Sequence, residues 1–206
     1  MNEVKEYFLK RPLDVMTAGF LLLLSLPAFL LIMPLVWWET RASVFSSQEM
    51  TGRKGKAFNL LRFRTLQPGV DKIWKGEEVK EDDPGTTRVG RFLINARLVG
   101  LPVLWNVLRG DMSFVGPRPE RPDQVAYLSR RLPRYNLRHM VRPGLVSLAT
   151  VYGDEDIPAS HRLKYDLFYL EKMGLMWDTR LLVSSTWRGL RGQLGLDEEE
   201  EEEEAT

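Results

Sequence analysis

Residues 98–122 read LVGLPVLWNVLRGDMSFVGPRPERP, a stretch whose two halves differ in chemistry. In residues 116–119 (GPRP), two prolines restrict the backbone on either side of Arg118 and lower the entropy lost when its side chain is held in a binding pose. The planar guanidinium suits the oxygens of a phosphate or pyrophosphate, although such a turn taken alone is often only a turn. Residues 98–102 (LVGLP) offer no nucleophile, acid or base. The stretch therefore predicts a candidate anion site, and it raises the question whether a catalytic group stands beside it.

The charge of the chain is unevenly distributed. Its 206 residues have a net charge of +1, but residues 197–204 (DEEEEEEE) hold eight of the acidic side chains. The body before them has 29 Lys and Arg against 20 Asp and Glu, a net charge of about +9. We expect residues 193–206 to form a disordered acidic tail, because a self-repelling run cannot bury apolar surface. The tail either keeps the terminus soluble or competes for the basic body, which suits polyanions, anionic lipid surfaces or phosphorylated substrates.

Several chemistries are excluded by composition. The chain has no cysteine, so it forms no disulfide, thiolate nucleophile or Cys-based zinc site. Its two histidines, His139 and His161, are far apart in the sequence, which argues against a histidine-rich metal site.

Residues 15–38 (VMTAGFLLLLSLPAFLLIMPLVWW) form 24 positions without a charge, long enough to span a bilayer. Two features favour a re-entrant hairpin over a spanning helix. Ser25 and Pro27 lie at the middle, where proline removes a helical hydrogen bond and kinks the helix, and the serine hydroxyl can cover a carbonyl freed there. Three Lys or Arg precede the run and four follow within 20 residues, so the positive-inside rule favours the cytoplasm at both ends. We therefore predict that residues 1–40 are an N-terminal re-entrant membrane anchor.

Residues 41–192 are expected to form one small domain. Residues 58–64 alternate as a strand does, which places Arg62 and Arg64 on one side, either as a solvated face or as a pair of phosphate ligands. Residues 67–87 are typical of a surface loop. Residues 88–108 hold two apolar periodic stretches, of which Trp105, Val107 and Leu108 are predicted to be core residues.

The remainder of this region predicts basic and apolar helices. Residues 121–142 are strongly basic and suit an amphipathic helix on a membrane surface, broken at Pro133. Nucleic acid is the rival partner for such a stretch, but no nucleic-acid-binding motif accompanies it, so we expect none. Residues 160–190 predict a helix whose apolar side packs in the core.

Several sequence blocks follow one another in a fixed order along nearly the whole chain. They are KRPLD (10–14), the apolar run with its break, QE (48–49), GRKGKAF (52–58), RFRT (62–65), TRVGRFL (87–93), LP (101–102), LWNVLRGDMS (104–113), VGPRPE (115–120), RPG (142–144) and YDLFY (165–169). In these blocks the chain resembles the bacterial sugar transferase family, the monotopic polyprenyl-phosphate phosphoglycosyl transferases.

The resemblance implies an α/β, mostly helical fold. A re-entrant membrane helix hairpin carries a small cytoplasmic phosphoglycosyl-transferase-type domain with amphipathic surface helices, on the cytoplasmic face of the bacterial inner membrane. Family members move a sugar-1-phosphate from a nucleoside diphosphate sugar, usually a UDP-sugar, to polyprenyl phosphate, and so start surface glycan assembly.

The resemblance also implies how the reaction proceeds. An aspartate attacks the β-phosphate of the donor and the neighbouring glutamate assists, while magnesium and arginines stabilise the transferring oxygens. The phosphate-binding candidates in this chain are Arg62, Arg64, Arg118 and Arg142, and the ligands of an expected Mg²⁺ are unassigned.

The chain departs from the family pattern at the reacting residues. The family's Asp-Glu pair sits just before a Leu-Pro, where this sequence has Val99 and Gly100. Neither can attack phosphorus, carry a proton or bind a metal through its side chain. Ile94 replaces a basic residue, residues 146–147 (VS) replace Thr-Gly, and residues 152–154 (YGD) replace an Asn-Gly-Arg-like element.

Three interpretations follow from this departure. In the first, the protein is a catalytically silent member, a pseudoenzyme, that keeps the membrane fold and binds a nucleotide sugar, a polyprenyl phosphate or an active homologue. In the second, it is an active transferase with a displaced nucleophile, for which Asp111 and Glu120 are the nearby carboxylates and Asp82–Asp83 are more distant; a structural turn acceptor is the preferred role of Asp111. In the third, it is a membrane-surface scaffold without a ligand. A homodimer is also compatible with the family.

Overall fold

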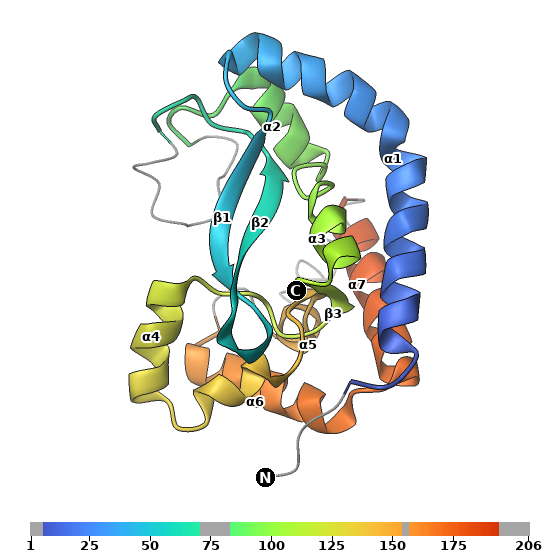
Figure 1. Ribbon diagram of the computed structural model, residues 1–206, viewed down its shortest axis with the longest axis vertical. Helices are drawn as coiled ribbons and strands as arrows, with labels where there is room; N and C mark the ends of the chain where they lie inside the picture. The colour runs from blue at the N-terminus through green and yellow to red at the C-terminus, as the bar shows by residue number, and fades with distance from the viewer. Residues whose placement is uncertain (1–5, 71–82, 154–156, 194–206) are drawn as a thin grey trace, which may run out of the picture.

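The computed structural model describes residues 6–70, 83–153 and 157–193. Asp82, the acidic run 197–204 and residue 154 of the YGD element lie outside these residues. Helices dominate the described chain and are joined by two small two-stranded sheets, which confirms the expected mostly helical class (Figure 1). The domain bounds at residues 40 and 192 stay predictions.

The first element, α1, runs from Lys10 to Thr40 and is the one helix of the described chain long and apolar enough to cross a membrane. It is continuous through Pro27 and Pro34 and is visibly bent (Figure 1). The hydroxyl of Ser25 donates to the carbonyl of Leu22, at 3.0 Å. Pro27 frees the carbonyl four residues before it, which belongs to Leu23, so the serine bonds the neighbouring carbonyl rather than the freed one.

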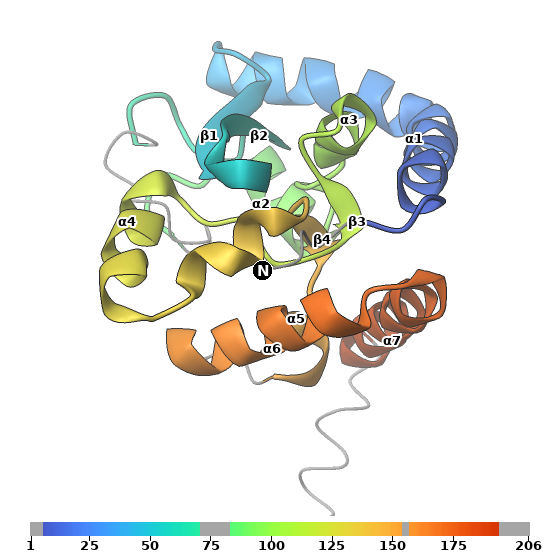
Figure 2. The same cartoon turned by 60° about the horizontal axis from the view of Figure 1, so that its bottom comes forward.

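The burial of α1 is concentrated at its two ends. Its buried residues lie near the start of the helix (Lys10, Asp14 and Ala18) and near its end (Ile32, Val36 and Thr40). Between them the apolar side chains are exposed, as for Leu23 (67%) and Leu30 (74%). α1 thus arches along the domain with its apolar middle unburied (Figure 2).

The start of α1 is fixed by the charged side chains of its first turns. Lys10 is 1% exposed and donates from Nζ to the carbonyl of Val115 (2.9 Å) and to Asp178 Oδ2 (2.5 Å). Arg11 donates to two carbonyls at the end of α3, 2.6 Å from each. Asp14 Oδ1 accepts from the hydroxyl of Ser113, at 3.1 Å. The KRPLD block therefore attaches the membrane helix to the domain.

The end of α1 is fixed as well. The carboxylate of Glu39 accepts from the backbone N–H groups of Arg88 (2.7 Å) and Val89 (2.8 Å), the first residues of α2. These N–H groups have no partner within the helix, so Glu39 caps α2 from a different element. Both ends of α1 are therefore held by one domain.

A β-hairpin lies at the centre of the domain. β1 (Phe45–Thr51) pairs antiparallel with β2 (Ala57–Phe63), with Phe45 opposite Phe63, and the tip is the 3₁₀ turn η1 (Arg53–Gly55). The strand predicted at residues 58–64 is confirmed, and in the structure it begins and ends one residue earlier. Lys54 in the tip has a left-handed backbone, with φ of 57°.

Two short helices follow, α2 (Arg88–Asn95) and α3 (Val103–Arg109). Val107 is fully buried and packs with Ala18 of α1, as predicted for the core. The same prediction is wrong for Trp105, which is 51% exposed. Trp105 is two residues from Val103 and from Val107, which places its side chain about 200° around the helix from each of them. Because the two valines pack toward α1, the side chain of Trp105 points outward.

A second sheet joins distant parts of the chain. β3 (Ser113–Val115) pairs in parallel with β4 (Gly144–Val146). A Cβ on Gly116 would lie 2.4 Å from the carbonyl oxygen of Arg142, and one on Gly144 would lie 2.1 Å from the nitrogen of Gly116. The glycines of the VGPRPE and RPG blocks are therefore needed for two backbone segments to touch.

The remaining helices surround this crossing. α4 (Pro122–Arg131) and the 3₁₀ helix η2 (Tyr135–Met140) are separated at Pro133, as predicted. α5 (Leu148–Tyr152) precedes α6 (Ala159–Lys172) and α7 (Leu175–Gln193). The single helix predicted over residues 160–190 is thus two helices, because the chain turns between Lys172 and Leu175. α6 and α7 lie on the opposite side of the domain from the C-terminal half of α1 (Figure 2).

Candidate phosphate-binding site

The positions of the missing carboxylates lie in the connection between α2 and α3. The carbonyl of Val99 accepts from the N–H of Phe63, at 3.0 Å, so this loop is held against the last residue of β2. Phe63 stands between Arg62 and Arg64 in the sequence, and the loop therefore lies beside the strand end that carries both arginines.

The two loop residues are in different surroundings. The side chain of Val99 packs against an apolar cluster that includes Phe63 and Ile32 of α1. Gly100 is exposed, and a Cβ built on it meets no heavy atom within 4 Å. An acidic side chain at Gly100 would fit without a clash, whereas valine at position 99 has become part of the core.

Arg62 and Arg118 are brought together from β2 and from the GPRP turn. Burial lowers the pKa of Arg118 below its usual range, and the nearby positive charges of Arg62 and Arg162 lower it further, against the opposing effect of Glu120. Burial also lowers the pKa of Arg62. A guanidinium disfavoured by burial and by neighbouring cations is stabilised by an anion, so Arg118, with Arg62 near it, is suited to phosphate oxygens.

The other two predicted phosphate ligands make different contacts. Arg64 Nε donates to the carbonyl of Ser43 (2.8 Å), in the segment between α1 and β1. Arg142 Nε donates to the carbonyl of Gly110 (3.1 Å), and its Nη1 pairs with the carboxylate of Glu6. Arg142 is therefore held in a network with Gly110 and Glu6.

Glu120 is part of a buried ionic cluster. Its side chain is 5% exposed, its Oε1 lies 2.6 Å from Arg138 Nη1, and its Oε2 accepts from the hydroxyl of Tyr135. Arg138 Nη2 in turn lies 2.9 Å from Asp166 Oδ2, a carboxylate from the YDLFY block. Burial raises the pKa of Asp166 to about 6, against the opposing charge of Arg138. Glu120 thus joins the GPRP turn to η2 and α6.

Asp111 lies in the turn after α3. Its Oδ2 is 3.4 Å from Asn106 Nδ2 and 3.8 Å from Arg109 Nε. These are contacts within the turn, the arrangement expected of a structural acceptor. Of the more distant carboxylates, Asp82 and Asp83, the structure describes Asp83, which begins the second described range.

Mg²⁺ is the metal that the family resemblance implies. Magnesium prefers carboxylate oxygens in octahedral geometry. Within residues 6–70, 83–153 and 157–193 no group of three or more His, Asp or Glu side chains is arranged to hold a metal ion. Val99 and Gly100 add no side-chain oxygen where the family has its carboxylates. The described residues therefore hold no ready-made cage of carboxylates for Mg²⁺, which proteins usually bind through one or two carboxylates and the phosphates of the substrate.

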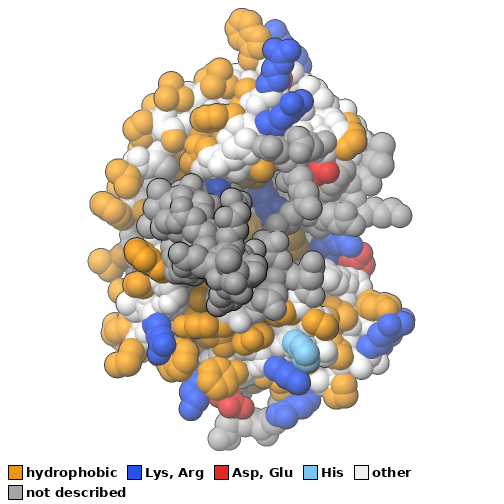
Figure 3. All heavy atoms as spheres, turned by 180° about the vertical axis from the view of Figure 1, so that it is seen from behind, with side chains coloured by type: hydrophobic (Ala, Val, Ile, Leu, Met, Phe, Trp, Pro, Cys, Tyr) orange, Lys and Arg blue, Asp and Glu red, His pale blue; other side chains and the backbone are white. Residues whose placement is uncertain are grey.

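One edge of the molecule is apolar, and a hollow on one face is basic. Figure 3 shows hydrophobic side chains projecting along the edge formed by α1, and Lys and Arg side chains in a hollow near the middle of the face. Positive charge in a hollow focuses the field and attracts anions.

Residues 5–192 match the sequence model of the family described as Bacterial sugar transferase. This chain belongs to the bacterial sugar transferase family. The match runs from before the start of α1 to residue 192, one residue before the end of α7.

Relatives of known name are found among bacterial sugar transferases. The chain is 35% identical over 183 residues to the "Exopolysaccharide production protein ExoY" of Rhizobium meliloti (strain 1021), covering 82% of this chain and 80% of that protein. It is 36% identical over 179 residues to the "UDP-glucose:undecaprenyl-phosphate glucose-1-phosphate transferase" of Caulobacter vibrioides, covering 84% and 67%. It is 32% identical over 185 residues to a "UDP-N-acetylgalactosamine-undecaprenyl-phosphate N-acetylgalactosaminephosphotransferase" of Aeromonas hydrophila, covering 88% and 43%.

Sequence reasoning missed the residues that hold this sugar transferase together. Lys10, Asp178 and Tyr169 form one buried cluster, and Glu120, Arg138 and Asp166 form another. The available signal was the position of Lys10, Glu120, Asp166 and Tyr169 inside the ordered blocks, although nothing in the sequence indicated that these blocks meet.

Proposed function

We propose that this sugar transferase is a catalytically silent member of its family. It binds a nucleotide sugar or polyprenyl phosphate at Arg62 and Arg118 and does not transfer sugar phosphate. The observation that carries the proposal is the loop beside the arginine pair, in which Val99 packs into an apolar cluster and Gly100 has no side chain. Among the described residues, positions 99 and 100 offer an anion held there neither a nucleophile nor a proton carrier.

An active enzyme with a displaced nucleophile is disfavoured by the contacts of the two carboxylates. Using Glu120 would break a buried ion pair with Arg138, which keeps its pair with Asp166, and would take away the acceptor of the Tyr135 hydroxyl. Asp111 is occupied within its own turn. Pairing with an active homologue, or with a second copy, would give a silent member a role at the membrane.

For the membrane arrangement we propose a re-entrant helix on the cytoplasmic face of the bacterial inner membrane. A straight helix of 31 residues is about 46 Å long, which exceeds the hydrocarbon thickness of about 30 Å. A spanning helix would carry its two ends to opposite sides. The contacts of Lys10 and of Glu39 with one domain support a hairpin that enters and leaves by the same leaflet.

The function is tested by restoring the missing pair. We would measure release of nucleoside monophosphate from a panel of UDP-sugars, with polyprenyl phosphate and Mg²⁺, for the native protein and for the V99D/G100E variant. We expect no turnover by the native protein and measurable turnover by the variant, because the glutamate enters open space and the aspartate restores a carboxylate to the loop that is bonded to the end of β2. Turnover by the native protein would refute catalytic silence.

A matched control separates chemistry from shape. The V99N/G100Q variant has nearly the same size as V99D/G100E but no nucleophilic carboxylate, and it should stay inactive. Binding of UDP-sugar to the native protein, with R118Q as the weakened variant, then checks that the arginine pair holds the donor. Absence of binding to the native protein of both nucleotide and polyprenyl phosphate would favour a membrane-surface scaffold.

A further inference from the structure

A second basic cavity lies at the opposite end of the hairpin from Val99. It has a volume of about 960 Å³ and is lined by the N-terminal segment, the hairpin tip, α4 and η2. The carbonyl of Val99 accepts from the N–H of Phe63, at the end of β2 away from the hairpin tip. β2 has seven residues with a rise of about 3.3 Å each, so Phe63 lies about 20 Å from the start of the strand at the tip. The cavity is therefore distinct from the loop that carries Val99 and Gly100.

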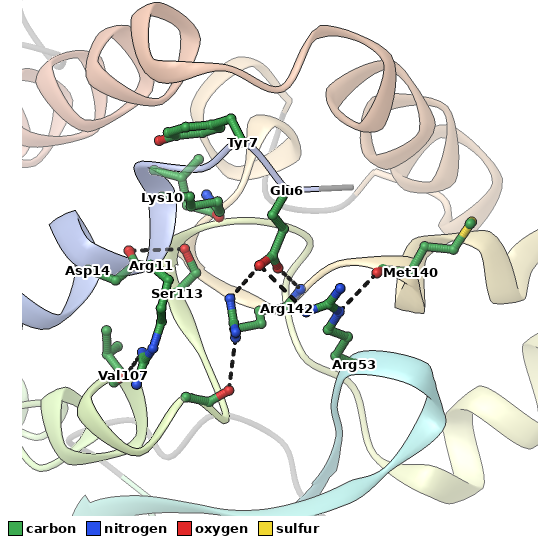
Figure 4. A network of polar contacts seen from close by, with 12 residues as sticks. Glu6, Tyr7, Lys10, Arg11, Asp14, Arg53, Val107, Ser113, Met140 and Arg142 are labelled. Carbon is green, nitrogen blue, oxygen red and sulfur yellow. Dashed lines mark hydrogen bonds and ion pairs between the residues drawn. The ribbon is translucent and has the colours of Figure 1, made fainter. Parts of the chain in front are cut away.

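Four permanent cations line this cavity: Arg11, Arg53, Lys54 and Arg142. The one carboxylate among the described residues of the lining is Glu6. Its Oε1 accepts from the backbone N–H of Arg142 (2.9 Å), and its Oε2 pairs with the guanidinium of Arg142 and lies 3.7 Å from Arg53 Nη1. Figure 4 shows the carboxylate of Glu6 pointing at both arginines. The N-terminal segment thus supplies an anion to a site with an excess of positive charge.

The walls of the cavity are partly apolar, and they adjoin the start of the membrane helix. Phe8, Val125 and Met140 are among the lining residues, and Phe8 is 90% exposed. Leu9 and Leu13, next to it, are 48% and 39% exposed. A ligand that suits these walls has an anionic head and tolerates an apolar neighbour, as a phosphate monoester does when it is free or when it is the head of a lipid.

We propose that this cavity is a second anion site that takes a phosphate monoester, and that Glu6 occupies it until the ligand replaces the carboxylate. A phosphate dianion presents three oxygens to the forked donors of Arg53 and Arg142, where a carboxylate presents two and carries one charge less. Binding of the ligand releases Glu6 and, with it, the segment before α1. The site does not depend on the chemistry at Val99 and Gly100.

The test measures phosphate binding to the full-length protein by titration calorimetry, in nanodiscs of phosphatidylcholine. Inorganic phosphate is the probe in the first arm. In the second arm the nanodiscs contain 10% phosphatidic acid, and hydrogen exchange of residues 6–13 reports release of the N-terminal segment. Binding in both arms means that the phosphate group suffices, and binding in the second arm alone means that the ligand is a lipid head; both support the site.

Three variants distinguish this site from general attraction to a basic protein. E6Q removes the competing charge, and we expect about a tenfold rise in affinity; R53Q removes one fork, and we expect about a tenfold loss. K172Q changes an exposed cation at the end of α6, outside the cavity, and should bind as the native protein does. The proposal fails if neither probe binds, or if E6Q and R53Q bind as K172Q does.

Discussion

Lys10 and Asp178 are 168 residues apart in the sequence and form an ion pair of 2.5 Å, with side-chain exposures of 1% and 7%. The pair joins the first turn of the membrane helix to α7. Tyr7 and Tyr169 also donate hydroxyl hydrogen bonds to the carboxylate of Asp178, at 2.9 Å each. A buried charge with this many partners is compensated, and the removal of one partner leaves the other uncompensated.

The K10M variant should lose about 3–5 kcal/mol of unfolding free energy, because Asp178 would remain buried without its cation. Denaturant unfolding in detergent, followed by tryptophan fluorescence, measures the change. K172M, at an exposed position of α6, is the control and should change stability by less than about 0.5 kcal/mol. The double variant K10M/D178L should recover part of the loss; a double variant as unstable as the sum of its single changes would mean that the two charges do not interact.

The crossing of β3 and β4 should tolerate no side chain at Gly144. G144A would put a Cβ 2.1 Å from the nitrogen of Gly116, and we expect a loss of about 3 kcal/mol or failure to fold. G100A is the matched change at a glycine with open surroundings, and we expect it to leave the melting temperature within about 2 °C of the native value. Equal melting temperatures for the two variants would contradict the close approach.

The placement of α1 can be read from single cysteines, because the native chain has none. Phe8 and Ser47, before and after α1, are exposed, and Leu24 lies in its exposed apolar middle. For a re-entrant helix, F8C and S47C both react with a membrane-impermeant maleimide only after the cells are permeabilised. L24C should react only in detergent, because lipid shields it. Labelling of one terminal cysteine in intact cells, and not of the other, would show that α1 spans the membrane.

Stability should depend on pH through His139. Burial, and then the charge of Arg138, lower the pKa of this imidazole from 6.5 to about 4, and its Nε2 is buried without a hydrogen-bond partner among the described residues. Between these values the unfolded chain binds a proton that the folded chain does not, so stability is lost as the pH falls from 6.5 to 4.

The size of this effect is at most about 3 kcal/mol, and the H139F variant should lack it. Unfolding curves at pH 7, 5.5 and 4.5 measure the difference between the two proteins. His161 is exposed on α6, so H161F is the control that should keep the native dependence on pH. A native and an H139F protein with parallel pH profiles would assign the dependence to other groups.

Much of the site was predictable because its information is local. The GPRP turn is recognisable from three rigid or permissive residues, and Val99 and Gly100 stand out by the absence of carboxylates before Leu101 and Pro102. The strand that carries Arg62 follows from the alternation of its side chains, and the break at Pro133 follows from the geometry of proline. The family follows from the order of the blocks, which no tertiary contact is needed to read.

The sequence by itself determined the family and the absence of carboxylates at residues 99 and 100, and it predicted most of the element types, because composition, periodicity and motif order are properties of neighbouring residues. Only the tertiary structure decided which cations share a site. Arg142 was grouped with Arg118 by their motifs, yet it meets Glu6, 136 residues away, while Arg118 meets Arg62. Trp105 was turned outward by the packing of Val107 on α1. Such contacts depend on how helices and strands pack across the whole chain, and that packing leaves no signal in any one stretch of it.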